Sequence, residues 1–355
     1  MAVKITKPSI NIREKLSELD KPAGIAGEAM LRAETPQEQF NLIGAGRKNL
    51  IINGGFDIWQ RGTSITGTYG NRPYTSDRWQ IYTVNTGATA TVTRSSDVPS
   101  SEFLYSAKFD ASATTNRVTF TTTVELPVAG NIYPFKENAT YTLSAWVKTD
   151  DPARARVYTA RFASAINAGQ QNCTVREIIG HTGGGGWEKV VYAIDIPTST
   201  ITTANQLRIM FSNKDGEGSN QSIAYYTGVQ LEHGKVATPF EHRSYGEELV
   251  LCKRYYQRLG HSDYLNNFPY PRLFILKRNF YESFPFMFEV EMRDAPTITA
   301  SSVTLLADGS GATLPISGLS FRSYRAGFQV ASTGTANTSP YEWHLHLPVI
   351  FDAEL

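Results

Sequence analysis

The sequence predicts a mainly β fold: an antiparallel β-sandwich, or jelly roll, with short N-terminal helices, a linking helix and a smaller C-terminal β domain. Two observations support this fold class. Between residues 49 and 241, apolar and polar residues alternate with a period of two in run after run, and clusters of Gly, Asn, Ser, Pro and Asp separate the runs. The chain of 355 residues also contains 18 Tyr and 18 Phe, a composition that favours strands.

The first 48 residues are predicted to form short capped helices. Asn11 and Glu14 have the spacing of a capping box, and Thr35 followed by Pro36 is a typical helix start. The apolar positions of these helices are Ile12, Leu16, Leu19, Phe40 and Leu42. Helices this short are marginal in water, so these side chains should dock onto the body of the chain, sister copies or a larger assembly. An attachment segment and a simple decoration of the body are both open alternatives.

Residues 49–243 should form the sandwich. In the run 141–148 the odd-numbered residues are apolar, which places Trp146 on the opposite strand face together with Lys148 and other polar side chains. Trp79 shares its strand face with Ile81 and is expected in the core.

Residues 244–260 are predicted to form the linking helix, because Ser244 and Glu247 have the spacing of a capping box. Its expected apolar face consists of Tyr245, Leu249, Cys252, Tyr256 and Leu259. Residues 261–355 return to strand patterns and should form the smaller β domain.

Charge and cysteine content narrow the function classes. Lys plus Arg (34) nearly balance Asp plus Glu (33), so neither nucleic acid nor an anionic membrane is an expected partner. The N-terminus lacks a signal-peptide pattern, and no apolar run reaches the length of a membrane span, so we expect synthesis in the cytoplasm and no membrane insertion. Cys173 and Cys252 are expected to be reduced and packed, and no cofactor is expected.

The sequence does not predict an enzyme. Its adjacent carboxylates, Asp150–Asp151 and Glu247–Glu248, fit a turn and the first turn of a helix better than a pair of catalytic acids facing each other across a cleft. The four glycines 183–186 lack the Lys-Ser/Thr of a phosphate loop and fit a hairpin loop.

Sugar binding requires fewer specialised groups than catalysis. It needs an aromatic face that lies under a pyranose ring and polar groups beside that face. Trp146 is the predicted centre of such a site, and Tyr158 in the next strand, flanked by Arg156, is expected to extend it. The alternative is that Trp146 packs under a loop or under the helix after Ser244. Trp187 opens a strand after the four glycines and is expected to anchor that strand.

His344 and His346 form a second candidate site. In a strand, their side chains share one face, and three chains meeting on a threefold axis would bring six imidazoles together, which suits octahedral iron or nickel. The alternative is an ordinary pair of histidines on a solvated strand face.

Five runs of the sequence stand out together: "NLIINGGFDIWQRG" (49–62), "YTSDRW" (74–79), "VQLEHGKVATPFEHRSYGEEL" (229–249), "CKRYYQ" (252–257) and "VEMRDAPTITA" (290–300). These runs resemble the tail-fibre and receptor-binding proteins of bacteriophages, especially those of cyanobacterial and marine phages. Residues 4–49 resemble the virion-attachment end of the same group, and residues 49–241 are similar to the jelly-roll carbohydrate-binding modules of glycosidases. Such modules often end in a "VQLE-G" phrase.

The resemblance implies a homotrimeric protein of the virion tail. Its N-terminus would attach to another tail protein, such as an adaptor, nozzle or baseplate protein, and its exposed part would touch host surface polysaccharide. Two alternatives remain open: a purely structural tail component that bridges other virion proteins without binding sugar, and a depolymerase of surface polysaccharide. The His-x-His phrase also resembles the metal-binding signature at the tips of some phage fibres.

The resemblance also bears on calcium. Related carbohydrate modules often carry an acidic residue shortly before the "VQLE" phrase, where this chain has Thr227, so a structural calcium ion is not expected. Asn53 and Asp57 remain as candidate oxygen ligands near the first strand.

Overall fold

The computed structural model describes residues 48–354 with gaps. The ranges left out are 84–85, 115, 126–138, 152–156, 164–170, 197–205, 213–222, 260–272, 275–283, 301–303, 308–312, 315–318, 333–342 and 347–348. The predicted attachment positions Ile12, Leu16, Leu19, Phe40 and Leu42 therefore lie outside the described residues. Residues 49–355 form one compact unit.

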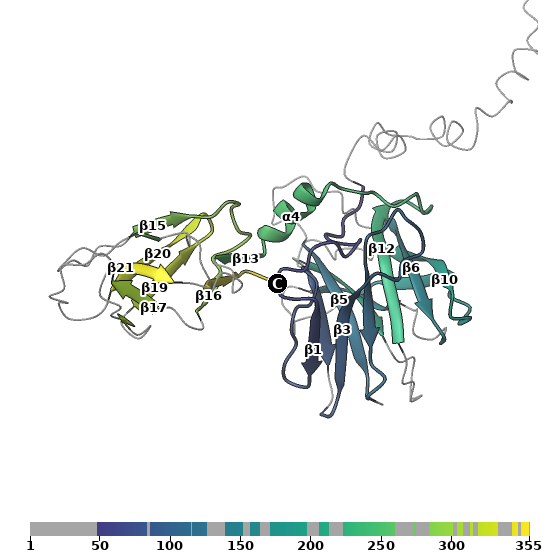
Figure 1. The fold of residues 1–355 in the computed structure, drawn as a ribbon. Coiled ribbons are helices and arrows are strands. Elements are labelled where there is room, and N and C mark those ends of the chain that lie inside the picture. Colours follow the sequence, from purple (N-terminus) through teal and green to yellow (C-terminus); the bar gives the residue numbers. More distant parts are fainter. Residues whose placement is uncertain are drawn as a thin grey trace, which may run out of the picture. The chain divides into compact units, whose positions relative to one another are not determined.

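Two antiparallel sheets form a sandwich, as the alternation predicts (Figure 1). The seven-stranded sheet runs in the order β1 (Ser64–Thr68), β3 (Thr89–Ser95), β4 (Ser106–Asp110), β12 (Ile223–His233), β6 (Thr140–Thr149), β10 (Trp187–Asp195) and β9 (Thr174–Ile179). The five-stranded sheet runs in the order β2 (Trp79–Thr83), β5 (Val118–Glu125), β11 (Gln206–Ser212), β7 (Val157–Ala163) and β8 (Gln171–Asn172).

The core between the sheets is strongly aromatic. Trp79 is fully buried, as predicted, and its ring centroid lies 4.8 Å from that of Phe120. Phe211 and Tyr226 join the two sheets, with ring centroids 4.8 Å apart. In β6 the odd-numbered side chains from Tyr141 are fully buried and face this core, so the predicted alternation is confirmed.

The linking helix is shorter than predicted. α4 spans Tyr245–Lys253, and β13 (Tyr256–Leu259) follows it where the sequence pattern predicted further helix. The capping box is present: Glu247 N donates to Ser244 Oγ at 3.3 Å, and Ser244 N donates to Glu247 Oε2 at 3.0 Å. Of the helices in the described ranges, none combines the length and apolar character needed to cross a bilayer.

The buried face of α4 also differs from the predicted one. Glu248 and Cys252 are its buried residues, whereas Tyr245 is 62% exposed. Glu248 is buried because Asn53 N donates to its Oε1 at 2.5 Å and Arg243 pairs with its Oε2 at 3.3 Å. Apolar periodicity does not reveal a helix face held by charge and hydrogen bonds.

Beyond α4 the described chain is again made of strands, as expected for the smaller β part. One sheet has the order β13, β22 (Val349–Asp352) and β16 (Thr297–Ala300). A second has the order β14 (Leu273–Phe274), β21 (Trp343–His346), β17 (Thr304–Ala307) and β18 (Thr313–Leu314). The third consists of β15 (Phe284–Met287), β20 (Gly327–Ser332) and β19 (Leu319–Tyr324).

Candidate functional site

The outer face of the seven-stranded sheet carries a cluster of half-buried aromatic side chains. Lys148 on β6 lies directly opposite Trp187 on β10 and Tyr225 on β12, and Trp146 is two residues away on the same strand face. Directly opposite residues in an antiparallel pair have Cβ atoms about 5 Å apart. Lys148 is therefore surrounded by aromatic side chains from three strands.

Asp97 fixes this cluster from the loop after β3. Its Oδ1 accepts a hydrogen bond from Trp187 Nε1 at 2.9 Å, and its Oδ2 accepts one from Lys148 Nζ at 2.6 Å. The Trp187 and Tyr225 rings stand nearly edge to face, with centroids 6.3 Å apart, and Lys148 Nζ lies 5.5 Å from the centre of the Tyr225 ring. We call these residues, Trp146, Lys148, Trp187, Tyr225 and Asp97, the aromatic face.

The charges of the aromatic face are mutually stabilised. The hydrogen bond from Lys148, helped by the one from Trp187, holds the pKa of Asp97 below its ordinary value. The same hydrogen bond raises the pKa of Lys148. Both groups therefore stay ionised around neutral pH, and Asp97 holds the Trp187 ring in place.

A bulge in β12 positions Trp146. The pairing with β6 shifts between Thr227 and Gln230, and Gly228 within the bulge has a φ of 59°. A Cβ atom on Gly228 would lie 2.9 Å from the ring of Phe103 and 3.1 Å from Cδ1 of Trp146. The missing side chain thus lets both rings close over the strand, and Trp146 ends half-buried.

The segment between β12 and α4 covers the neighbouring part of the same sheet. Thr142 Oγ1 donates to Gly234 O at 2.7 Å, and Thr238 N donates to Glu232 Oε1 at 2.9 Å. Lys189 Nζ reaches the same segment at Thr238 O, at 3.1 Å. Thr142 and Ser144, which share the strand face of Trp146, are buried here, so the open part of the face begins at Trp146.

The structure places two of the predicted sugar-site residues, Trp146 and Tyr158, in different sheets. Trp146 lies on β6 of the seven-stranded sheet, but Tyr158 lies on β7 of the five-stranded sheet, so the expected extension of one platform across neighbouring strands is wrong. Strand alternation tells which residues share a face but not which sheet the next strand joins. Arg156 lies outside the described residues. Trp187 and Tyr225 instead lie opposite Lys148, two residues along β6 from Trp146 on the same strand face.

The candidate metal residues are placed only in part. His344 and His346 lie in β21, opposite Leu306 and Thr304 of β17. Their side chains are outside what the structure describes, so the metal site stays a prediction. Among the described residues, no group of three or more His, Cys, Asp or Glu side chains is placed to hold a metal ion.

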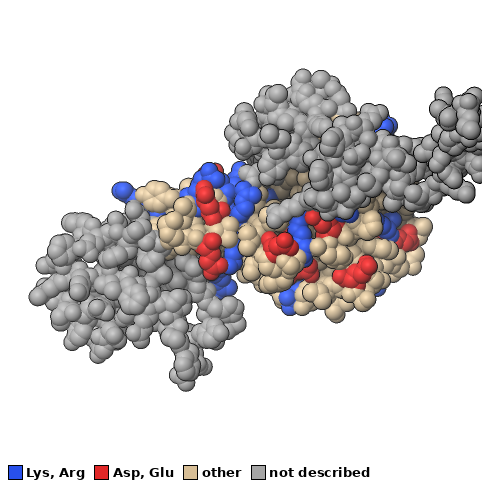
Figure 2. Space-filling view, turned by 90° about the horizontal axis from the view of Figure 1, so that it is seen from above, with Lys and Arg blue, Asp and Glu red and all other residues tan. Residues whose placement is uncertain are grey.

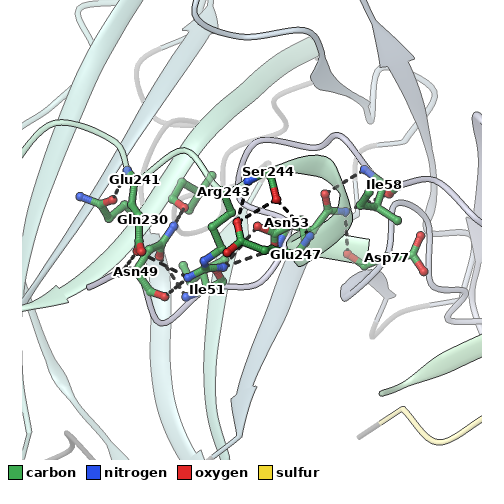
Figure 3. A network of polar contacts seen from close by, with 12 residues as sticks. Asn49, Ile51, Asn53, Ile58, Asp77, Gln230, Glu241, Arg243, Ser244 and Glu247 are labelled. Atoms are coloured by element: carbon green, nitrogen blue, oxygen red, sulfur yellow. Dashed lines mark hydrogen bonds and ion pairs between the residues drawn. The ribbon is translucent and has the colours of Figure 1, made fainter. Parts of the chain in front are cut away.

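The side-chain amide of Asn53, one of the candidate calcium ligands, makes hydrogen bonds within the sandwich. Its Nδ2 donates to Ile58 O at 2.9 Å and to Asp77 O at 3.0 Å, while its Oδ1 accepts from Ile58 N at 3.0 Å (Figure 3). This leaves little capacity for a cation. Asp57 is partly buried, and its pKa is raised first by burial and then by the nearby Glu248.

Polar contacts bind the segment before α4 to the sandwich (Figure 3). Arg243 donates to Asn49 O and, at 3.2 Å, to Ile51 O. Glu241 N donates to Gln230 Oε1 at 2.8 Å, and Glu241 Oε2 accepts from Asn49 N at 2.6 Å. The "TPFEHRS" phrase is therefore the joint at which the chain leaves the last sandwich strand, fastened by its polar side chains.

The charged surface is mixed. On the face shown in Figure 2, basic and acidic side chains are interspersed over the described surface, in line with the nearly equal totals of 34 Lys and Arg and 33 Asp and Glu.

Both described cysteines are free and buried, as expected, and burial raises the pKa of the Cys173 thiol to about 12.

Comparisons with known proteins give weak likenesses. No protein-family model matches the chain, and no curated protein matches it. Among solved structures, the enzymatically active domain of tailspike protein 4 of bacteriophage CBA120 matches with a TM-score of 0.32 and 14% identity over 52% of this chain and 21% of its own.

Two further solved structures match at a similar level. The CBM22-2 xylan-binding domain from Paenibacillus barcinonensis Xyn10C has a TM-score of 0.31 and 16% identity over 48% of this chain and 99% of its own. A cyclase from Fischerella sp. TAU has a TM-score of 0.30 and 13% identity over 52% of this chain and 96% of its own. These likenesses are too weak to assign an activity to the chain.

Proposed function

We propose that the chain is a bacteriophage tail-fibre protein that recognises host-surface glycan through the aromatic face. In this proposal the N-terminal segment attaches the protein to another tail protein, and the protein acts as a homotrimer in the virion tail. The sequence resemblance suggests the tail, and the geometry of the aromatic face suggests the glycan.

The observation that supports glycan binding most directly is that Asp97 fixes the Trp187 ring directly and also holds Lys148, which contacts the Tyr225 ring. Pyranose rings bind by laying their C–H faces on aromatic rings, while hydroxyl groups need hydrogen-bonding partners at the edge. Trp187 and Tyr225 supply the rings, and Asp97 and Lys148 supply an acceptor and a donor beside them. Because the side chains are already fixed by each other, binding costs little ordering of the protein.

A glycan array made from bacterial surface polysaccharides and oligosaccharides tests the proposal. The purified full chain is expected to bind at least one glycan class. The Trp187→Ala variant is expected to lose roughly tenfold in affinity, corresponding to about 1.4 kcal/mol. The matched control is Tyr69→Ala, which removes an aromatic side chain that is 51% exposed and lies outside the aromatic face.

The other outcomes identify the alternatives. A full chain that is folded and incorporated into virions but binds no glycan on the array indicates a structural tail component. Release of reducing ends from a polysaccharide that the chain binds indicates a depolymerase. Equal loss of binding in Trp187→Ala and Tyr69→Ala would show that glycan binds elsewhere than on the aromatic face.

A further inference from the structure

Buried charges connect the sandwich to the strands beyond α4. Arg61 and Arg78 belong to the sandwich and have side chains only 10% and 1% exposed. Glu354, which follows β22, is 4% exposed and meets both of them. Arg78 Nη1 donates to Glu354 Oε2, and Arg61 Nη2 donates to Glu354 Oε1 at 3.2 Å. One carboxylate is thus held between two guanidinium groups.

The sandwich positions both guanidinium groups without help from Glu354. Arg78 Nη2 donates to Thr123 O at 2.6 Å, and Arg61 Nη1 lies 3.5 Å from Asp77 Oδ1. Asp77 is itself fixed by Gln60, whose backbone N and side-chain Nε2 donate to it at 2.8 and 2.9 Å. We call Arg61, Arg78, Asp77 and Gln60 the arginine socket. These side chains of the sandwich carry one more positive than negative charge, and Glu354 and Asp352 supply the carboxylates from β22 and the residues after it.

Two tyrosines from the chain after α4, Tyr255 and Tyr256, cover the socket. Arg78 Cζ lies 3.5 Å from the ring centre of Tyr255, and Arg61 Cζ lies 3.7 Å from that of Tyr256. The end of β22 is tied to the same two tyrosines: Ala353 N donates to Tyr255 O at 2.8 Å, and Asp352 pairs with Tyr256. Glu354 is therefore delivered to the socket by the strand pair β13 and β22.

We propose that the arginine socket is a carboxylate-binding site and that Glu354 acts in it as a lock between the sandwich and the strand pair. A buried guanidinium without a counter-charge is strongly destabilising. The lock is therefore either closed, with Glu354 inserted, or open, with the strand pair withdrawn and both arginines hydrated. This inference does not depend on glycan binding or on attachment to a tail.

Three variants of the full chain test the lock. Glu354→Gln keeps the shape of the side chain but removes its charge, and it is expected to lower the unfolding midpoint by about 5 °C or more. Its amides in β13 and β22 should also exchange hydrogen faster. The control is Asp352→Asn, because Asp352 touches Arg61 at 3.3 Å from a position that is 37% exposed. Its effect should be much smaller.

Glu354→Ala tests the binding site directly. Sodium acetate should raise the unfolding midpoint of this variant more than sodium chloride at the same ionic strength, and it should have no such selective effect on the unaltered chain. If acetate and chloride act alike, the socket is not a carboxylate site. If Glu354→Gln and Asp352→Asn are equally harmless, Glu354 is not a lock.

The unaltered chain provides the test if the Glu354 variants do not fold. The amide of Ala353, bonded to Tyr255 O, should exchange as slowly as the amides of β6 in the sandwich. Exchange at the rate of exposed backbone would contradict the lock.

Discussion

At the scale of single residues, Trp146 stands at the boundary between core and solvent. One edge of its ring packs against Gly228, and the side chain remains half-buried. We expect Trp146→Ala to weaken glycan binding and to lower the unfolding free energy by clearly less than the roughly 3–5 kcal/mol that truncation of a buried Trp costs. Trp79→Ala, in the core, gives the full cost for comparison. Chemical denaturation and the glycan array measure both. A loss at Trp146 as large as that at Trp79 would place Trp146 in the core.

Asp97 sets the pH range of the aromatic face. Its folded pKa is lowered relative to the unfolded chain, so its contribution to stability is present above the unfolded pKa of about 3.9 and is lost as the pH falls through the lowered folded value. Glycan binding should therefore be nearly constant from neutral pH down to mildly acid pH and fall only in strong acid. Binding measured against pH, with Asp97→Asn as the control for other carboxylates, checks this. An unaltered chain that loses binding between pH 7 and 5 would contradict it.

Only part of the aromatic face can be predicted from the sequence. The alternation in 141–148 correctly puts Trp146 and Lys148 on the outer face. The contribution of Trp187 and Tyr225 depends on which strands pair with β6, and that pairing joins residues about 40 and 80 positions away in the sequence. Asp97 enters from a loop, where no periodicity constrains the side chain.

At the scale of elements, the bulge in β12 shapes the site. Gly228→Ala would force a side chain into a left-handed backbone and against the rings of Phe103 and Trp146, so we expect a destabilisation of about 1–3 kcal/mol. The fluorescence of Trp146 should also change. Gly246→Ala in α4 is the matched control, since a Cβ there meets no atom within 4 Å. That variant should be neutral or slightly stabilised. Equal effects of the two substitutions would show that the bulge does not constrain the rings.

The start of α4 could be predicted from its capping box, but its end and its buried face could not. The run after Cys252 keeps an apolar helical spacing, yet Tyr256 pairs with Asp352 in a strand. A partner nearly 100 residues further along overrides the local pattern. The buried position of Glu248 likewise depends on Asn53 and Arg243, which come from other segments.

At the scale of the whole molecule, the body from residue 49 onward forms a compact unit separate from the first 48 residues. We expect a chain lacking the first 46 residues to remain soluble and folded, with an unchanged β circular-dichroism spectrum. It should fail to enter virions when supplied in place of the full chain. Particle incorporation measured by immunoblot decides this, with the full chain carrying the same tag as the control. A truncated chain that still assembles into particles would refute the attachment role.

The class of the fold was predictable because sandwich strands carry a strict period of two, which many short runs repeat. The division of twelve strands into sheets of seven and five was not, because β6 and β7 are neighbours in sequence yet belong to opposite sheets. The alternation of apolar and polar residues along a strand is the same whichever of the two sheets the strand joins.

The pairing of β13 with β22 has a practical consequence for protein engineering. Leu259 and Val349 are direct partners, so the chain departs from the joint and comes back to it at adjoining positions, about 5 Å apart between Cα atoms. The segment between them therefore begins and ends at neighbouring positions, but it includes β16, which also pairs with β22. A foreign domain whose own termini lie equally close can replace this segment only if β22 stays paired with β13 in the absence of β16, while the sandwich, α4 and the returning strand keep their native sequence.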